Sequence, residues 1–208
     1  PEYAGLHMNQ WAIRNGETNF GSTLHWMEPR IDAGPIALKK EFVILPNDTG
    51  LSLFIKCSNV GAELVLKALK MIDEGEKLPK IPQDLSKRFL YRHKDALDGS
   101  VRWKMTAKEI INLVRALDYS LFTSPTTSPT ASINGMQIII RKARIIDNVE
   151  GDPGKILSIV DDGIIVGSGN NKSVMLTMVE CPDKGTLSGI EIGSSLSINL
   201  GDKFKIVD

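Results

Sequence analysis

A chain of 208 residues with 25 acidic and 25 basic side chains is not a polyelectrolyte that binds a charged partner over its whole surface. Hydrophobic residues make up 42% of it, which is ordinary for a globular protein of one large or two small domains. The sequence has no apolar run of about 18 residues, so it predicts no membrane span, and it has no signal peptide pattern.

The two cysteines, Cys57 and Cys181, lie far apart in the sequence and do not have the spacing of a metal site. We therefore expect a reduced, cytoplasmic protein that binds no metal. The chain begins at Pro1 rather than at Met, and we interpret it as part of a longer protein.

The first part of the sequence predicts an α/β arrangement. A short helix is expected over residues 8–14, then strands over 20–27 and 36–44. A long helix is expected from residue 51 to about 73, with Asp48 or Thr49 as its cap and Gly75 at its end. Two strands and one long helix are too little for a complete domain, so we expect more sheet upstream of Pro1 or a partner on this piece.

Residues 77–108 contain nine basic and three acidic side chains. The segment is either a solvated linker or a surface for a partner that carries phosphate groups. Thr106 and Glu109 form a capping box that predicts the start of another helix, which ends near residue 118. A stretch rich in Ser, Thr and Pro over 120–132 then indicates a domain boundary.

From residue 133 onward the pattern is that of short strands separated by Gly, Asn and Asp turns, which predicts a small β-barrel. Strands are expected over 136–146, 155–160, 163–167, 173–180, 196–200 and 203–207, with a hairpin turn at Asp161-Asp162. This part carries eight basic and ten acidic residues, so its net charge does not indicate nucleic-acid binding.

Several short motifs stand in a fixed order near the start of the chain. Pro1, Tyr3 and Gly5 form a Pro-x-Tyr-x-Gly pattern, and Gln-Trp-Ala-Ile-Arg-Asn-Gly-Glu-Thr occupies residues 10–18. Thr-Leu-His follows at 23–25, and Asp-x-Gly-x-Ile at 32–36. In this order the motifs resemble the folate-dependent formyltransferases, although Gln10 replaces an Asn and Arg102 replaces an acid of the family pattern.

The resemblance implies a division of the chain into four parts. Residues 1–76 would be the C-terminal part of a catalytic domain of the nucleotide-fold type, and 77–119 a basic linker with a helix. Residues 120–132 would be a boundary loop. Residues 133–208 would form a C-terminal β-barrel similar to an oligonucleotide-binding fold.

The resemblance also implies roles for individual residues. Asp32 would be catalytic, handling protons beside the donor 10-formyltetrahydrofolate. The pteridine of the donor would contact Arg30, Ile31, Ala33 and Gly34. The Asn-x-His pair with which the family stabilises the oxyanion is not present in this sequence, and the family order would place it before Pro1. His25 is an alternative partner for Asp32, although a lone histidine on a strand is more often structural.

The function implied is transfer of a formyl group to the amino group of initiator methionyl-tRNA in translation initiation. The residues expected to contact tRNA are Lys87, Arg88, Arg92, Lys94, Arg141 and Lys142. One alternative is a formyltransferase that acts on a nucleotide-linked amino sugar, a possibility made credible by the acidic balance of the C-terminal part. Another is a binding fragment without catalytic activity, because the Asn-x-His pair is missing.

Overall fold

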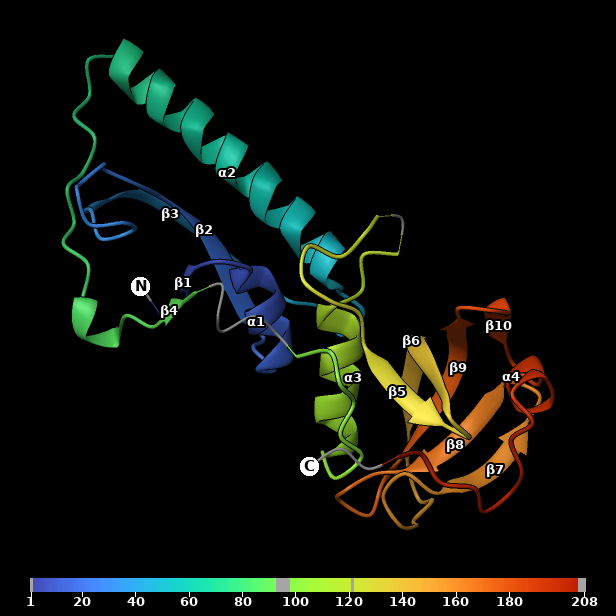
Figure 1. Ribbon diagram of the computed structural model, residues 1–208. Coiled ribbons are helices and arrows are strands. Elements are labelled where there is room, and N and C mark those ends of the chain that lie inside the picture. Colours follow the sequence, from blue (N-terminus) through green and yellow to red (C-terminus); the bar gives the residue numbers. More distant parts are fainter. Residues whose placement is uncertain (1, 93–97, 121, 206–208) are drawn as a thin grey trace. The chain divides into compact units, whose positions relative to one another are not determined.

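The computed structural model describes residues 2–92, 98–120 and 122–205. The chain forms two compact units, residues 1–96 and 97–208 (Figure 1). Each unit has its own secondary structure and its own buried residues, and each is described by itself below.

The first unit is a small α/β assembly, as the sequence predicts. Its elements are β1 (Ala4–Gly5), α1 (Met8–Arg14), β2 (Asn19–His25), β3 (Ile36–Val43), α2 (Gly50–Asp73), the 3-10 helix η1 (Leu85–Lys87) and β4 (Leu90–Tyr91). Strands β2 and β3 form an antiparallel hairpin, and α2 lies along it (Figure 1). The predicted helices and hairpin strands agree with these bounds to within about two residues.

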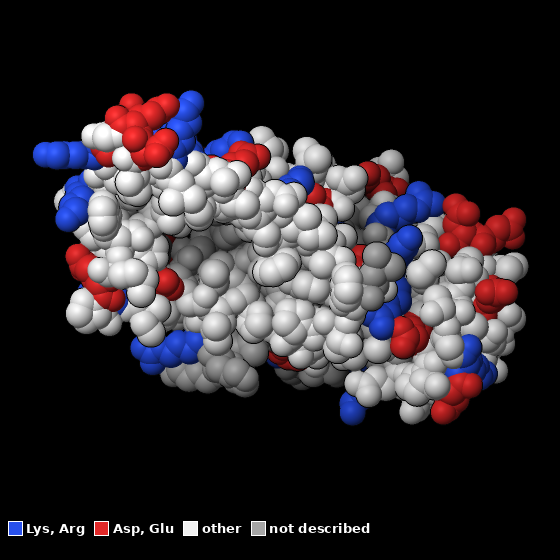
Figure 2. Space-filling view, turned by 90° about the horizontal axis from the view of Figure 1, so that it is seen from above, with Lys and Arg blue, Asp and Glu red and all other residues white. Residues whose placement is uncertain are grey.

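Helix α2 begins at a capping box in which Thr49 and Ser52 exchange hydrogen bonds. Its buried side chains include Leu53, Val60, Leu64 and Ala68, which are spaced by seven or four residues and so share one face. Large apolar side chains on its other faces remain exposed; they are Phe54, Ile55, Val65, Leu66, Leu69 and Ile72. The surface over the first unit is accordingly mostly uncharged in Figure 2, which looks down on the molecule from above the view of Figure 1.

The second unit combines one antiparallel sheet with two helices. Its elements are α3 (Ala107–Ala116), β5 (Thr130–Ile133), β6 (Met136–Ile146), β7 (Ile156–Val160), β8 (Gly163–Gly167), β9 (Ser173–Cys181), β10 (Gly185–Ser188) and α4 (Glu191–Ser195). The strand order is β5-β6-β9-β8-β7, and β10 also pairs with β9. The core includes Trp103, Ile138, Ile140, Ile164 and Leu176, all of them fully buried.

The closed barrel expected from the sequence is not confirmed. Within residues 98–120 and 122–205, β5 and β7 stand at opposite ends of the strand order and do not pair with each other. The end of the chain reaches both of them, because Ile156 N donates to Asp202 O at 2.8 Å and Lys205 N donates to Ser132 O at 2.8 Å. These separate hydrogen bonds tie the two edges together without forming a continuous ladder.

Two strand predictions near the C-terminus differ from the structure. The strand expected over 196–200 is wrong, because Leu196 caps the C-terminus of α4 and the following residues form a turn. Of the strand expected over 203–207, Lys203 makes one isolated bridge with Lys155, and residues 206–208 lie outside the described part. Leu196 and Ile198 are buried whereas Leu200 is 72% exposed, so the apolar alternation there reflects packing of a turn.

The described residues contain neither a membrane-spanning helix nor a metal-binding cluster. No helix among residues 2–92, 98–120 and 122–205 is long and apolar enough to cross a membrane. The same part of the chain contains no group of three His, Cys, Asp or Glu side chains arranged to hold a metal ion.

Candidate active site

The loop between β2 and β3, residues 26–35, has a tightly fixed backbone. Trp26 N donates to Pro35 O at 2.9 Å and closes the loop at its base, and Ala33 N donates to Arg30 O at 3.3 Å near its tip. Gly34 is packed so closely that a Cβ at this position would lie 1.8 Å from Trp26 O. Asp32 has a left-handed backbone with φ of 54°, a conformation that Asp tolerates better than most residues.

The Asp32 carboxylate lies between two groups from different parts of the unit. Its Oδ2 accepts a hydrogen bond from Gly5 N at 3.3 Å, and its Oδ1 lies 3.9 Å from His25 Nε2. The side chain is 42% exposed, so solvent or a substrate can reach it. A fixed carboxylate of this kind can accept a proton directly or through one water molecule.

His25 is oriented by its other ring nitrogen. Nδ1 lies 2.9 Å from Trp26 O, and a carbonyl oxygen can only accept, so Nδ1 carries a proton. Nε2 is the nitrogen that faces Asp32. As the sequence allowed, His25 lies near Asp32, but not within hydrogen-bonding distance.

Gly5, whose N–H donates to Asp32, lies in the parallel pair formed by β1 and β4. Ala4 and Gly5 lie opposite Leu90 and Tyr91, and the φ of Gly5 is 99°. A Cβ on Gly5 would lie 2.2 Å from Tyr91 O, so only glycine fits. Neither two-residue strand was predicted, because so short a pairing across more than 80 residues leaves no local pattern in the sequence.

The residues expected to contact folate divide into two groups. Arg30 and Ile31 are exposed at the loop tip, Ile31 by 73%, so their side chains are accessible to a ligand. Ala33 and Gly34 are buried, which leaves mainly their backbone groups available.

Two residues that the sequence analysis did not place in the site also contact this loop. Gln83 Nε2 donates to Asp32 O at 3.1 Å and to Gly34 O at 2.6 Å. Arg88 Nη2 donates to Ile31 O at 2.9 Å. Their position in a charged, linker-like segment about 50 residues downstream gave no signal of this contact.

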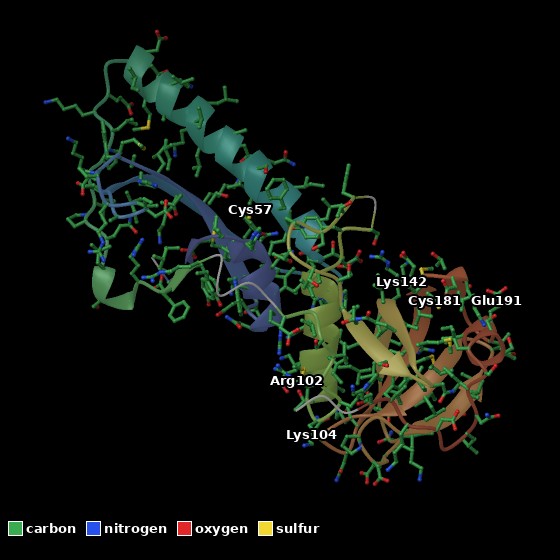
Figure 3. The ribbon with its side chains drawn as sticks, in the orientation of Figure 1. Cys57, Arg102, Lys104, Lys142, Cys181 and Glu191 are labelled. Atoms are coloured by element: carbon green, nitrogen blue, oxygen red, sulfur yellow. The ribbon has the colours of Figure 1, made fainter. Side chains whose placement is uncertain are left out.

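The residues expected to contact tRNA have different environments. Arg88 is engaged with the loop, Lys87 lies 3.9 Å from Asp84, and Arg92 is exposed. Lys94 lies outside the described residues. In the second unit, Arg141 Nε donates to Glu180 at 2.8 Å, whereas Lys142 is exposed on β6 (Figure 3).

Other basic residues of the second unit also have acidic neighbours. The pairs are Arg144–Asp162 at 3.2 Å, Lys172–Asp147 at 2.9 Å and Lys203–Asp152 at 3.4 Å. Arg102, which stands where the family pattern has an acid, pairs with Asp98 at 3.0 Å. On the face drawn in Figure 2, basic and acidic side chains of this unit are interspersed.

Comparison with known proteins identifies the family. A family model described as formyl transferase matches residues 1–69, and one described as formyl transferase, C-terminal domain, matches residues 95–196. The chain belongs to the formyl transferase family. The resemblance seen in the short N-terminal motifs is thus confirmed over most of the chain.

One curated formyl transferase relative is the methionyl-tRNA formyltransferase of Syntrophus aciditrophicus (strain SB). It is 31% identical over 176 residues, which are 84% of this chain and 54% of the relative. The chain therefore spans about half the length of the relative it matches.

Solved structures with the same fold include two bound to folate compounds. HypX from Aquifex aeolicus in complex with tetrahydrofolic acid has a TM-score of 0.68 at 19% identity, over 100% of this chain and 36% of that one. The N-formyltransferase from Helicobacter canadensis, in complex with folinic acid and dTDP-3-aminofucose, has a TM-score of 0.65 at 21% identity, over 84% of this chain and 61% of that one. At these identities the likeness establishes the formyl transferase fold.

Proposed function

We propose that the protein carrying this chain transfers a formyl group from 10-formyltetrahydrofolate to the amino group of methionyl-tRNA, in the cytoplasm, at translation initiation. The observation that carries the proposal is the Asp32 carboxylate, which lies 3.3 Å from Gly5 N and 3.9 Å from His25 Nε2 on a hydrogen-bonded loop of a formyl transferase chain. The acceptor is taken from the relative with 31% identity, which is named methionyl-tRNA formyltransferase.

The chemistry requires a group that moves protons. The acceptor amine attacks the formyl carbon, and a C–N bond forms as the carbonyl oxygen becomes an oxyanion. The attacking nitrogen then loses a proton, while N10 of the folate gains one as its bond to the formyl carbon breaks. Asp32 would take the first proton and return it to N10, directly or through water. In the family pattern, stabilisation of the oxyanion belongs to the Asn-x-His pair.

The donor would lie against the loop that holds Asp32. Arg30 and Ile31 offer exposed side chains, and Ala33 and Gly34 offer backbone groups. This arrangement suits a flat heterocycle with several hydrogen-bonding atoms, such as the pteridine of 10-formyltetrahydrofolate.

A nucleotide-linked amino sugar is the second candidate for the acceptor. The ion pair between Arg141 and Glu180 and the engagement of Arg88 with the loop leave fewer cations for tRNA phosphates than the sequence suggested. The formyltransferase from Helicobacter canadensis has the same fold and was solved with dTDP-3-aminofucose. A sugar acceptor would require no extended basic surface.

The test is an assay of the protein expressed from its complete gene, with 10-formyltetrahydrofolate and either methionyl-tRNA or a dTDP-linked amino sugar. We expect formylation of methionyl-tRNA and a tRNA affinity that falls steeply between 50 and 200 mM salt, as phosphate contacts require. Turnover with the amino sugar alone would establish the second candidate. Absence of turnover and of folate binding would leave the hypothesis of a non-catalytic binding protein.

The matched variant is Asp32→Asn, which keeps the size of the side chain and an acceptor for Gly5 N. We expect turnover to fall by at least about 100-fold, the scale of an acid–base group, with tRNA affinity and melting temperature unchanged. Near-normal turnover in this variant would remove Asp32 from the mechanism.

A further inference from the structure

The segment from Pro79 to Tyr91 is anchored along the loop that carries Asp32. Ile36 N donates to Ile81 O at 2.7 Å, Ile81 N donates to Ile36 O at 3.0 Å, and Trp26 Nε1 donates to Pro79 O at 2.8 Å. Beyond Ile81, Gln83 and Arg88 make the contacts with the loop described above. The segment thus follows the loop from its base at Ile36 to its tip at Ile31.

At four positions of this segment, the exposure of apolar and polar side chains is the reverse of the usual pattern. Ile81 and Phe89 are more than half exposed, at 56% and 59%, whereas the polar side chains of Gln83 and Arg88 are partly buried. The Nε of Arg88 is buried without a hydrogen-bond partner in the described part of the chain, which is unfavourable for a guanidinium. Apolar packing therefore does not explain why Gln83 and Arg88 point inward.

The inward orientation of Gln83 and Arg88 is explained by their hydrogen bonds to the loop. The carbonyls of Ile31, Asp32 and Gly34 lie in the connection between the strands, where the β2–β3 ladder supplies no donors. A glutamine side chain has two N–H groups, and Gln83 Nε2 donates to the carbonyls of Asp32 and Gly34. Arg88 donates to the third carbonyl, that of Ile31. The three hydrogen bonds bracket Asp32 on both sides along the backbone.

We propose that Gln83 and Arg88 are positioning residues that fix the Asp32 loop in its catalytic conformation. The inference rests on the proposed formyl transfer and deepens it. Direct contacts to the Asp32 carboxylate are long, 3.3 Å to Gly5 N and 3.9 Å to His25 Nε2, so its location depends mainly on its own backbone. That backbone has a positive φ, a conformation that residues other than glycine adopt infrequently.

The test uses Gln83→Leu and Gln83→Glu in the protein expressed from its complete gene. Leucine removes both donors, and glutamate keeps the shape but sets acceptors against the two carbonyls. We expect kcat to fall roughly 100-fold, the cost of a catalytic group displaced by about 1 Å, with a smaller change in KM. Arg88→Met should act in the same direction, and Arg88→Lys should restore part of the loss by supplying one donor.

Gln137→Leu is the control, because Gln137 is an exposed glutamine on β6 in the other unit. It should leave both kcat and KM at the wild-type values.

A double-mutant cycle separates positioning from a merely structural role. If Gln83 acts through Asp32, then Gln83→Leu should have little further effect on kcat in an Asp32→Asn background. Independent, multiplicative losses would overturn the proposal, as would wild-type kcat in Gln83→Leu.

Hydrogen exchange keeps the inference separate from the proposed function. In Gln83→Leu, the amides of Trp26 and Ala33 should exchange faster, because their partners Pro35 O and Arg30 O belong to the loop. If these amides exchange faster in Gln83→Leu but the protein transfers no formyl group, the role of Gln83 in holding the loop stands and only the proposed reaction is refuted. Unchanged exchange in a protein that does transfer formyl groups would refute the positioning role alone.

Discussion

At the scale of single residues, two positions in the Asp32 loop are restricted for different reasons. Asp32 has a positive φ, which a short polar side chain tolerates. Gly34 does not have a positive φ, and its restriction is steric: a Cβ would lie 1.8 Å from Trp26 O, with His25 Nδ1 at 3.3 Å. Gly34 therefore allows the two arms of the loop to approach.

This contact makes Gly34→Ala a test of how rigid the loop is. We expect a loss of about 1–3 kcal/mol in the free energy of unfolding, because backbone atoms rather than a flexible side chain must move. Urea unfolding measures it. Gly61→Ala is the control: nothing lies within 4 Å of a Cβ there, and alanine in a helix should stabilise α2 by about 0.5–1 kcal/mol. Equal stability of Gly34→Ala and wild type would show that the loop adjusts freely.

The sequence predicts the contiguous part of the candidate site but not the residues that reach it from elsewhere in the chain. Asp32 and its neighbours occupy one short motif, so their order along the chain is enough to propose them as site residues. Gln83 and Arg88 enter the loop from about 50 residues downstream, and Arg88 was interpreted as a tRNA contact because it lies in a basic segment. A count of charges does not reveal that a guanidinium is directed at a backbone carbonyl.

At the scale of elements, local signals decided which predictions held. Helices α2 and α3 have apolar periodicity and capping boxes, and the short helix α1 ends at an Asn-Gly pair; all three agree closely with the prediction. The two-residue strands β1 and β4 and the short helix α4 were missed, because each depends on distant partners or on packing. Strand β5 likewise begins at Thr130, inside the Ser-, Thr- and Pro-rich stretch 120–132 that was predicted to be a boundary loop.

Helix α2 has a charged N-terminal network whose stability should depend on pH. Asp48 is 5% exposed and accepts hydrogen bonds from Leu45 N, Ser52 Oγ and Lys56 Nζ at 2.7, 2.9 and 2.6 Å. Burial alone raises the pKa of this carboxyl, but the bonds from Lys56, Leu45 N and Ser52 outweigh it, so the pKa is lowered overall. The ionised form is therefore favoured by folding.

Asp48→Asn should cost about 1–2 kcal/mol in the free energy of unfolding at pH 7, the scale of a charge-assisted hydrogen bond. A lowered pKa means that this stabilisation is complete above the unfolded value of about 3.9 and is lost as the pH falls through the folded value. Urea unfolding across a pH series should thus show the two proteins converging below about pH 4. Asp73→Asn, at the exposed last turn of α2, should change little. A difference that persists at low pH would assign the effect to packing instead.

At the scale of the whole molecule, the two units differ in how much apolar surface they leave uncovered. The first exposes a set of large side chains on α2, including Phe54, Leu66 and Leu69. In the second, the buried set includes Trp103, Phe204 and residues from β6, β8 and β9. The C-terminal family model matches residues 95–196, and the second unit spans residues 97–208, so the two begin at nearly the same residue.

The second unit should therefore fold by itself. We expect residues 97–208 to unfold in urea in one cooperative transition, because their core is built from their own side chains. Trp103 is the only tryptophan in this unit, is fully buried and lies 4.7 Å from the Phe204 ring, so its fluorescence reports on the core. Fluorescence and far-UV circular dichroism should give the same midpoint.

Adjacent positions on β6 supply a matched pair of variants for that fragment. Ile138 is fully buried and Gln137 is exposed, because neighbouring residues of a strand face opposite sides of the sheet. Ile138→Ala should lower the free energy of unfolding by about 2–5 kcal/mol, and Gln137→Ala by less than about 0.5 kcal/mol. Equal effects of the two, or separate midpoints for the two probes, would mean that this core needs residues outside 97–208.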